Sequence, residues 1–365
     1  MIRIGLIGVG RMGISHLAIA NAHPDVEIAY ICDRPGPVPS AIKAYTAFPR
    51  FSDYRKAIAE GGADAVIVAT PTGTHDEVSR AALGAGQHVF VEKPFSLDPD
   101  DGDALAALAE EKGLVNQVGY HNRFIGTFGE ARRLLADQVL GRLHHAHGEA
   151  YGQVVTRPQS GSWRFSSKKE GGCLLDYASH VIDLMNFLIG PPKSVSGSVL
   201  QSIYSRDVDD AVYASLGYDG FSGQLSVNWS DETYRKMTTR VSVQGDLGKI
   251  TVDRQELRIY LRDARPDLDL KAGWNIRYIT ELTAPVWFYL RGEEYSAQLA
   301  AFVAAIQSGK PAVPSTFRTA TETDRVVAMI RDDAEGRGGA PATQGARQKG
   351  FFGRLFGGGE AGSRG

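Results

Sequence analysis

The chain has 365 residues, of which 43% are hydrophobic and 22% are charged, and its 40 basic and 42 acidic side chains give a formal charge of −2. This composition is typical of a folded protein and excludes a wholly disordered chain, a collagen-like chain and a disulfide scaffold. Because the charges nearly balance, no overall field attracts nucleic acid or an anionic membrane. Since single cores stop growing near roughly 250–300 residues, the length predicts two domains.

The cellular compartment is predicted from the cysteines and from the apolar runs. Cys32 and Cys173 each lie inside an apolar run without metal-ligand spacing, so we expect reduced thiols. The N-terminal segment lacks the basic start and the long apolar stretch of a secretory signal. No apolar run reaches the roughly 18 residues that suggest a membrane span. We therefore expect a cytoplasmic protein.

The first 120 residues alternate short apolar runs with segments of helical spacing. The predicted strands are Ile2–Ile7, Val26–Cys32, Ala65–Ala69, His88–Val91 and Val115–Tyr120. The predicted helices between them are Met12–Ala22, Tyr54–Ala59, His75–Leu83 and Asp101–Lys112. Such alternation predicts an α/β domain, over residues 1–121, with a parallel sheet covered on both faces.

After residue 122 the pattern changes to period-two stretches separated by turn residues. Strands are expected at Leu143–Val154, Ser194–Ile203, Ala211–Tyr218, Ser222–Val227, Thr239–Val243, Lys249–Val252 and Glu256–Leu261. Helices are expected at Gly172–Ile189, Glu293–Gln307 and Thr319–Glu335. Residues 122–335 are therefore predicted to form an α+β domain with an antiparallel sheet. The pattern leaves open whether the last helices pack back on the first domain.

The last 30 residues, Gly336–Gly365, are rich in glycine and carry a net positive charge. Such a composition buries too little apolar surface to fold alone, so we expect a disordered tail. Within it, the segment Lys349–Phe356 combines three phenylalanines with basic residues, a pattern that can contact a membrane surface or a partner protein. The alternative is a flexible end with incidental aromatic residues.

A glycine-rich turn follows the first predicted strand and opens the first helix. In Gly8-Val-Gly10-Arg-Met-Gly13, the first glycine allows a tight turn, the second allows close approach of a pyrophosphate, and the third allows the helix to pack on the strand. Asp33 stands twenty residues later, where a carboxylate can accept both adenosine ribose hydroxyls. This favours NAD. Arg34 leaves NADP open, because an arginine here can hold a 2′-phosphate.

One apolar helical segment carries a narrow polar stripe. Asp176, His180 and Asp183 are spaced four and three residues apart on one face, and almost every other residue of Leu174–Ile189 is apolar. Buried ionisable side chains need a partner or a ligand. We expect His180 to titrate near neutrality and to carry a proton, while a buried structural salt bridge is the alternative. Without a further ligand cluster, we predict no metal.

Two further motifs suggest a family. Ala69-Thr-Pro-Thr-Gly-Thr-His75 and Val91-Glu-Lys-Pro94 each end a predicted strand. Together with Gly8–Gly13 and the segment Gly171–Asp183, they resemble the Gfo/Idh/MocA family of sugar and inositol oxidoreductases, from Met1 to about residue 335. The sequence departs from many relatives at Cys173, where a glycine is common, and at Asn122, where a basic residue is common.

The resemblance implies a Rossmann domain followed by an α+β domain with a large, mainly antiparallel open sheet. It implies NAD(P) chemistry on a secondary hydroxyl of a sugar, polyol or nucleotide-sugar, with Lys93 and His180 acting at that hydroxyl and Asp176 beside them. It also implies a cis Lys93–Pro94 bond and a homo-oligomer, a dimer or a tetramer. Two other activities stay open: an NAD-dependent glycosidase that oxidises its sugar transiently, and a non-catalytic dinucleotide-binding regulator.

The candidate contact residues come from these motifs. Those expected to contact the cofactor are Gly8, Gly10, Arg11, Met12, Gly13, Asp33, Arg34, Thr70, Pro71, His75, Glu92 and Lys93. Those expected to contact substrate are Tyr120, Asn122, Arg123, Trp163, Arg164, Asp176 and His180. Thr74 is alternatively a helix cap, and Trp163-Arg164 a core tryptophan beside a surface arginine. The basic stretch Arg262–Arg291 either closes over a sugar or holds a diphosphate.

Overall fold

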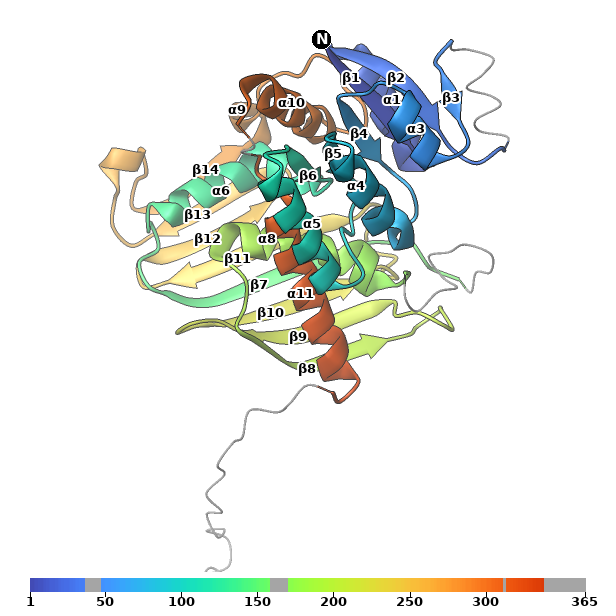
Figure 1. Ribbon diagram of the computed structural model, residues 1–365. Coiled ribbons are helices and arrows are strands. Elements are labelled where there is room, and N and C mark those ends of the chain that lie inside the picture. Colours follow the sequence, from blue (N-terminus) through green and yellow to red (C-terminus); the bar gives the residue numbers. More distant parts are fainter. Residues whose placement is uncertain (37–46, 158–169, 311–312, 338–365) are drawn as a thin grey trace, which may run out of the picture.

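The first third of the chain forms a six-stranded parallel sheet in a computed structural model that describes residues 1–36, 47–157, 170–310 and 313–337 (Figure 1). Its strands are β1 (Ile2–Ile7), β2 (Val26–Cys32), β3 (Arg50–Phe51), β4 (Ala65–Val68), β5 (His88–Val91) and β6 (Asn116–Val118). The order β3-β2-β1-β4-β5-β6 reverses direction beside β1, where Rossmann sheets bind dinucleotides.

Helices cover both faces of this sheet. They are α1 (Arg11–Ala22), α3 (Tyr54–Glu60), α4 (His75–Gly84) and α5 (Pro99–Glu111), with a 3-10 turn η1 (Thr72–Thr74) before α4. Helix α5 begins where the sequence favours a start, because Asp98 accepts a hydrogen bond from the Asp100 amide and Pro99 occupies the first turn. The buried strands are apolar on both sides, as a covered parallel sheet requires.

The second sheet has eight strands in the order β14-β13-β12-β11-β7-β10-β9-β8. They are β7 (Leu143–Tyr151), β8 (Ser194–Gln201), β9 (Ala211–Gly217), β10 (Ser222–Asn228), β11 (Thr238–Gly245), β12 (Gly248–Asp253), β13 (Glu256–Leu261) and β14 (Gly273–Tyr278). All neighbouring pairs are antiparallel except β7 and β10. The predicted fold class, a Rossmann domain followed by a mainly antiparallel sheet, is confirmed.

Helical segments lie on one face of the second sheet (Figure 1). They include α6 (Gly126–Ala136), the π-helical turn η3 (Leu174–Ala178), α8 (Ser179–Ile189) and α11 (Phe317–Ala334). The other helical elements after the first domain are η2 (His121–Phe124), η4 (Pro266–Leu268), α9 (Ile279–Leu282) and α10 (Glu293–Ser308). Among the described residues, no helix is both long and apolar enough to cross a membrane.

The last two helices join the two sheets. Leu299 and Phe302 of α10 are buried in one core with Ile4 and Ile67 of the first sheet. Helix α11 packs against α5 of the first domain and against β8 and α8 of the second. The two sheets are therefore held together by helices that come last in the chain.

The sequence patterns missed several elements. We predicted one helix over Gly172–Ile189, but a π-helical turn precedes α8. Strand β3 was not predicted because it is only two residues long. Strand β14 was not predicted because it lies at the sheet edge with alternate residues exposed, and α6 because Gly126 and Gly129 weaken its helical pattern.

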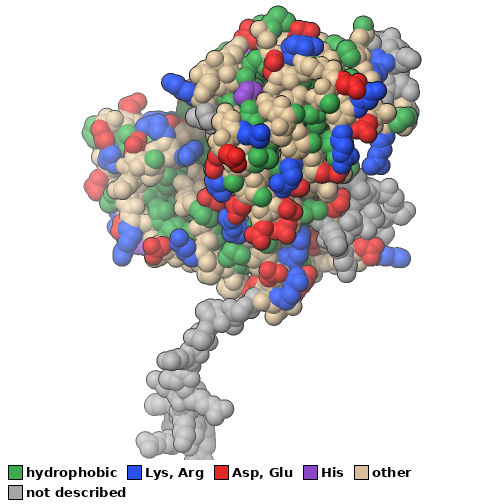
Figure 2. Space-filling view, in the orientation of Figure 1, with side chains coloured by type: hydrophobic (Ala, Val, Ile, Leu, Met, Phe, Trp, Pro, Cys, Tyr) green, Lys and Arg blue, Asp and Glu red, His purple; other side chains and the backbone are tan. Residues whose placement is uncertain are grey.

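Side chains of both charges are interspersed over the face of the molecule shown in Figure 2. That distribution agrees with the balanced composition, and it means that no field of one sign dominates this face.

Candidate functional site

The glycine turn between β1 and α1 has the geometry of a pyrophosphate cradle. Gly8 has φ +93°, and a Cβ there would lie 2.6 Å from the carbonyl oxygen of Ala69. A Cβ on Gly13 would lie 2.0 Å from the carbonyl oxygen of Gly8, so this glycine lets α1 approach the strand. Gly10 faces open space, and among the described residues no side-chain cap is found at the N-terminus of α1. The amide groups of the first helical turn are thus free for an anion.

Asp33 stands directly after β2 and is tied to the glycine turn. Its Oδ2 accepts a hydrogen bond of 2.7 Å from the Val9 amide, and its Oδ1 accepts one of 2.6 Å from the Arg34 amide. The carboxylate is only half-buried, while Arg34 is exposed. Each carboxylate oxygen can accept a further bond, so the adenosine ribose hydroxyls that we expect at this position can still be accommodated.

A cavity of about 360 Å³ continues from the glycine turn toward the second domain. It is lined by Gly10, Arg11, Met12, Ala69, Thr70, Pro71, Thr72, Glu92, Lys93, Pro94, Glu170, Gly171, Gly172, Leu175, Asp176 and Arg291. Seven of the residues predicted from the ends of β1, β4 and β5 line it, because the carboxyl ends of parallel strands meet at one edge of a sheet; they are Gly10, Arg11, Met12, Thr70, Pro71, Glu92 and Lys93. Open space at Gly10, free amides and this cavity fit a bound dinucleotide.

His75 is placed beside this cavity and does not line it. Its Nδ1 lies 2.9 Å from the carbonyl oxygen of Pro94, and its Nε2 lies 3.0 Å from that of Thr70. Burial lowers the pKa of His75, and these two carbonyl contacts oppose that change. The buried ring therefore joins the loop after β4 to the loop after β5. Thr74 does not cap α4, because its hydroxyl donates to the Thr70 hydroxyl and to the carbonyl of Pro71.

Lys93 connects the two domains across the cavity. Its Nζ donates to the Asp176 carboxylate at 2.8 Å and to the Asp176 carbonyl at 2.9 Å. The side chains are 14% and 17% exposed, so this ion pair is sheltered but still reachable from the cavity. The Lys93–Pro94 bond is cis, as the resemblance implied.

Glu92, next to Lys93, is buried beneath the cavity. His16 on α1 lies 2.5 Å from its Oε1, and the Lys93 amide donates to its Oε2. Burial raises the pKa of Glu92, but the bond to His16 and the nearby positive charges more than offset this, so the pKa is lowered. Glu92 thus anchors the base of the loop that carries Lys93.

His180 lies one turn beyond Asp176, near the start of α8. Its ring is buried, and its Nδ1 has no hydrogen-bond partner within the part of the chain that the structure describes. Burial, followed by the charge of Lys93, lowers the pKa of His180 well below 6.5. The near-neutral titration that we expected is therefore displaced to lower pH, and His180 is neutral and able to accept a proton at physiological pH.

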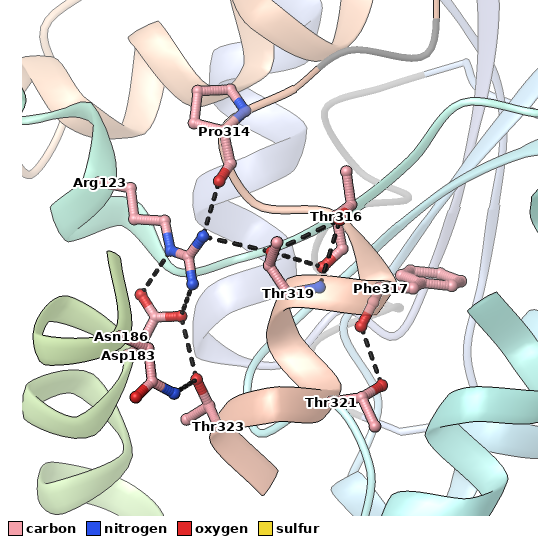
Figure 3. Close-up of polar contacts among 9 residues, drawn as sticks. All are labelled: Arg123, Asp183, Asn186, Pro314, Thr316, Phe317, Thr319, Thr321 and Thr323. Atoms are coloured by element: carbon pink, nitrogen blue, oxygen red, sulfur yellow. Dashed lines mark hydrogen bonds and ion pairs between the residues drawn. The ribbon is translucent and has the colours of Figure 1, made fainter. Parts of the chain in front are cut away.

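The third member of the polar stripe, Asp183, forms a separate ion pair (Figure 3). Arg123 donates to both oxygens of Asp183, at 2.6 and 2.8 Å, and also to the Pro314 carbonyl and the Thr319 hydroxyl. Both charged side chains are almost fully buried. We predicted a substrate contact for Arg123, but the structure places its guanidinium in this network, which joins η2, α8 and α11.

Tyr120 and His121, at the start of the η2 turn, lie beside His180. The Tyr120 ring is buried 6.1 Å from the His180 ring, and Asn122 accepts a long hydrogen bond of 3.4 Å from Arg254. The His121 ring lies 5.0 Å from that of His180 at an angle of 70°. We predicted Tyr120 and Asn122 as site residues but missed His121, which stands between them. Trp163 and Arg164 lie outside the described residues.

Several other cavity residues escaped the sequence analysis. Glu170 and Arg291 both line the cavity, although neither belongs to a motif that sequence spacing distinguishes. The sequence feature that could have indicated Arg291 was its position at the end of the basic stretch Arg262–Arg291. In the described part of the chain, no group of three or more His, Cys, Asp and Glu residues could hold a metal ion.

Comparisons with known proteins agree with this geometry. Residues 2–120 match the family model described as "Oxidoreductase family, NAD-binding Rossmann fold", and residues 128–251 match the "GFO/IDH/MocA C-terminal domain". An inositol 2-dehydrogenase of Rhizobium meliloti is 26% identical, covering 92% of this chain and 98% of that protein. A putative UDP-kanosamine synthase oxidoreductase subunit of Amycolatopsis mediterranei is 28% identical, covering 94% and 99%. A levoglucosan dehydrogenase solved with NADH and levoglucosan superposes with a TM-score of 0.80 at 23% identity, covering 92% and 97%.

Proposed function

Because the chain belongs to the GFO/IDH/MocA family of NAD-binding oxidoreductases, we propose that it transfers a hydride between a secondary hydroxyl of a sugar, polyol or nucleotide-sugar and nicotinamide. The names of its relatives, which act on inositol, levoglucosan and UDP-sugars, support this substrate class. The chain aligns over nearly the full length of the first of them. The family membership therefore extends to both the cofactor end and the substrate end.

One observation carries the proposal: the ion pair between Lys93 and Asp176 across the cavity that begins at the glycine turn. Lys93 comes from the loop after β5 and Asp176 from the turn before α8. An ion pair with a purely structural role has no need of access to a cavity. A group that binds a substrate hydroxyl, in contrast, must be accessible from the cavity. The pair thus lies at the boundary between the two predicted domains, residues 1–121 and 122–335.

Bound NAD would supply the hydride acceptor, and the chain supplies the handling of the proton. The Lys93 ammonium can donate a hydrogen bond to the substrate hydroxyl oxygen and stabilise the negative charge that develops there. Burial and the charge of Lys93 lower the pKa of His180, which keeps its ring neutral. A neutral imidazole has a free nitrogen lone pair, which the hydroxyl proton can occupy. Asp176 holds the Lys93 ammonium at 2.8 Å and can bind a neighbouring hydroxyl.

The cofactor would be held by the turn and the strand ends already described. Gly10 and the free amides of α1 suit the pyrophosphate, with Arg11 and Met12 beside it, while Asp33 suits the adenosine ribose. Thr70 and Pro71 line the cavity between the glycine turn and Lys93. Arg34 is exposed near Asp33 and remains the group that could accept a 2′-phosphate.

The outer face of the second sheet supports a homo-oligomer. Tyr260, Trp274, Ile276 and Tyr278 are 41–49% exposed on the β13–β14 edge, opposite the face that carries the core. Exposed apolar groups that gather in this way are typical of protein–protein contacts. The two cysteines are buried and free, which suits the reducing cytoplasm that we expect.

A substrate screen tests the proposal. Purified protein with NAD should produce NADH fluorescence with at least one member of a panel of inositols, aldoses, anhydrosugars and UDP-sugars. Release of a sugar substituent without net NADH would instead indicate the glycosidase. Tight NADH binding without turnover of any panel member would favour a regulator and contradict the proposal.

A further inference from the structure

The arginines of the basic stretch Arg262–Arg291 lie in different surroundings. Arg265 forms an exposed ion pair with Asp267 at 2.7 Å. Arg277 pairs with the Glu130 carboxylate on α6. Arg291, at the end of the stretch, lines the cavity that also contains Lys93 and Asp176. Arg291 therefore lies at the candidate active site, whereas Arg265 and Arg277 do not line it.

The backbone and the side-chain surroundings of Arg291 are both unusual. Its backbone φ is +67°, a conformation that costs energy for a side chain of this size. Its guanidinium lies 5.5 Å from the centre of the Tyr295 ring, within cation–π range. In the described part of the chain, no carboxylate forms an ion pair with it. An exposed cation kept in a strained backbone at a cavity wall suggests a ligand.

A stack of rings relates Arg291 to the catalytic histidine. The Tyr295 ring lies parallel to the His121 ring, with centres 4.6 Å apart and an angle of 18°. The His121 ring in turn contacts His180, with centres 5.0 Å apart. Tyr295 belongs to the first turn of α10 and His121 to η2, so two rigid elements fix this spacing. Arg291 contacts the Tyr295 ring, and two ring contacts, Tyr295 with His121 and His121 with His180, connect that ring to His180.

Most other charges around the cavity already have partners. Lys93 is paired with Asp176 and Glu92 with His16, while Arg254 is paired with Glu294 at 2.6 Å. The cofactor pyrophosphate has the free amides of α1, with Arg11 beside them. Glu170 is the remaining carboxylate of the wall, and its Oε1 lies over Gly73 on the cofactor side. Among the described cations that line the cavity, Arg291 is the one outside the glycine turn that no carboxylate pairs with.

We propose that Arg291 binds an oxyanion of the substrate, so that the preferred substrate is a sugar bearing a carboxylate or a phosphate. A guanidinium suits this role because its planar fork donates two parallel hydrogen bonds to a carboxylate or phosphate. The stack through Tyr295 and His121 would then set the distance between the anionic group and the hydroxyl that reacts at His180. This inference rests on the proposed function and makes its substrate class narrower.

The test compares acidic and neutral sugars in matched pairs. Glucuronate against glucose probes a carboxylate, glucose 6-phosphate against glucose probes a monophosphate, and UDP-glucose against glucose probes a diphosphate. Each sugar is titrated calorimetrically into the enzyme–NADH complex and assayed for turnover. The wild type should prefer one acidic member, and Arg291→Gln should weaken that preference roughly 10–100-fold through KM, as expected for a lost charged hydrogen bond. Binding of the neutral partner should be unchanged.

Two further variants and one control make the outcome specific. Arg291→Lys should retain part of the preference, because it keeps the charge but loses the fork. Arg262→Gln, an exposed arginine of the same stretch outside this cavity, should behave as the wild type. NADH titrations should give the same Kd for all variants. An unchanged Kd separates a substrate anchor from a contact with the cofactor.

Three results would overturn the inference. One is equal binding of acidic and neutral sugars by the wild type, and another is binding of no acidic sugar at all. The third is an NADH Kd raised at least tenfold in Arg291→Gln, which would assign the arginine to the cofactor pyrophosphate. Because the calorimetric arm needs no turnover, it can fail or succeed independently of the proposed oxidation.

Discussion

At the scale of single residues, the same side chain type serves opposite purposes according to its surroundings. Asp33 is half-buried, accepts two backbone amides and faces the place where we expect adenosine. Asp183 is fully buried against Arg123 and is not among the described residues that line the cavity beside Lys93. Burial raises the pKa of Asp183, and Arg123 opposes that rise. The carboxylate of Asp33 is thus available to a ligand, whereas that of Asp183 takes part in the packing of the fold.

Replacement of Asp33 by serine tests the cofactor preference. The hydroxyl can still accept one backbone amide, but the charged hydrogen bonds to ribose are lost, at a cost of roughly 1.5–3 kcal/mol. We expect weaker NAD binding and a relative gain for NADP, with Arg34 able to contact the 2′-phosphate. Fluorescence titration with NADH and NADPH measures the ratio. A ratio equal to that of the wild type would show that Asp33 does not select the cofactor.

The sequence predicted residue identities at the site better than residue environments. Lys93 and Asp176 were both expected there, and the structure joins them at 2.8 Å. The pKa of His180 was not predictable, because burial of its ring and the charges of Lys93 and Arg254 lower it only after folding. Spacing along the chain cannot reveal such neighbours.

At the scale of elements, the turn before α8 explains why the polar stripe divides. A regular helix would place Asp176, His180 and Asp183 on one line, but Asp176 lies in a π-helical turn. Such turns are frequent at functional sites. Here Asp176 reaches Lys93, while Asp183 reaches Arg123 on η2. Sequence periodicity assumes a constant helical repeat, so it could not predict this division.

Breaking the buried ion pair of Arg123 and Asp183 should strongly destabilise the fold (Figure 3). Asp183→Asn leaves a buried guanidinium without its counter-ion, which typically costs about 3–5 kcal/mol. The matched control is Asp103→Asn. In the wild type, the exposed carboxylate of Asp103 pairs with Arg318 and Arg325 on helix α11. We expect that variant to lose less than about 1 kcal/mol. Urea unfolding measures the free energy of unfolding of both variants. An equal loss of this free energy in the two variants would contradict the assigned role of Asp183.

At the scale of the whole molecule, helices that are distant in sequence assemble the cleft. Alternation of strands and helices was enough to predict the parallel sheet, and period-two stretches predicted most of the second sheet. The packing of α10 on the first sheet and of α11 on α5 could only be left open, because helical spacing does not name a partner. These contacts fix the distance between Lys93 and the segment that carries His180.

The glycine-rich tail should contribute nothing to this assembly. Most of it lies outside the described residues, and its composition cannot bury a core. We expect deletion of residues 338–365 to leave the melting temperature and the turnover unchanged. Sedimentation with anionic vesicles, run on the intact and shortened chains, tests the alternative membrane contact. Loss of activity or precipitation of the shortened chain would show that its phenylalanines pack on the folded body.

The central claim is that Lys93 and His180 act together on one hydroxyl, and a double-variant cycle measures this directly. Proton transfer by a positioned group typically contributes about 10²–10⁴-fold, so Lys93→Met and His180→Ala should each lower kcat at least about a hundredfold. Dinucleotide binding should survive in both, because neither residue belongs to the glycine turn. Because burial lowers the pKa of His180, the wild-type acid limb should lie below pH 6.5.

The double variant decides the claim. If both residues serve the same proton, its kcat should fall by much less than the product of the two single losses. NADH Kd, measured on the same preparations, controls for damage to the fold. Near-normal kcat in His180→Ala, or losses that multiply fully in the double variant, would contradict shared action on one hydroxyl.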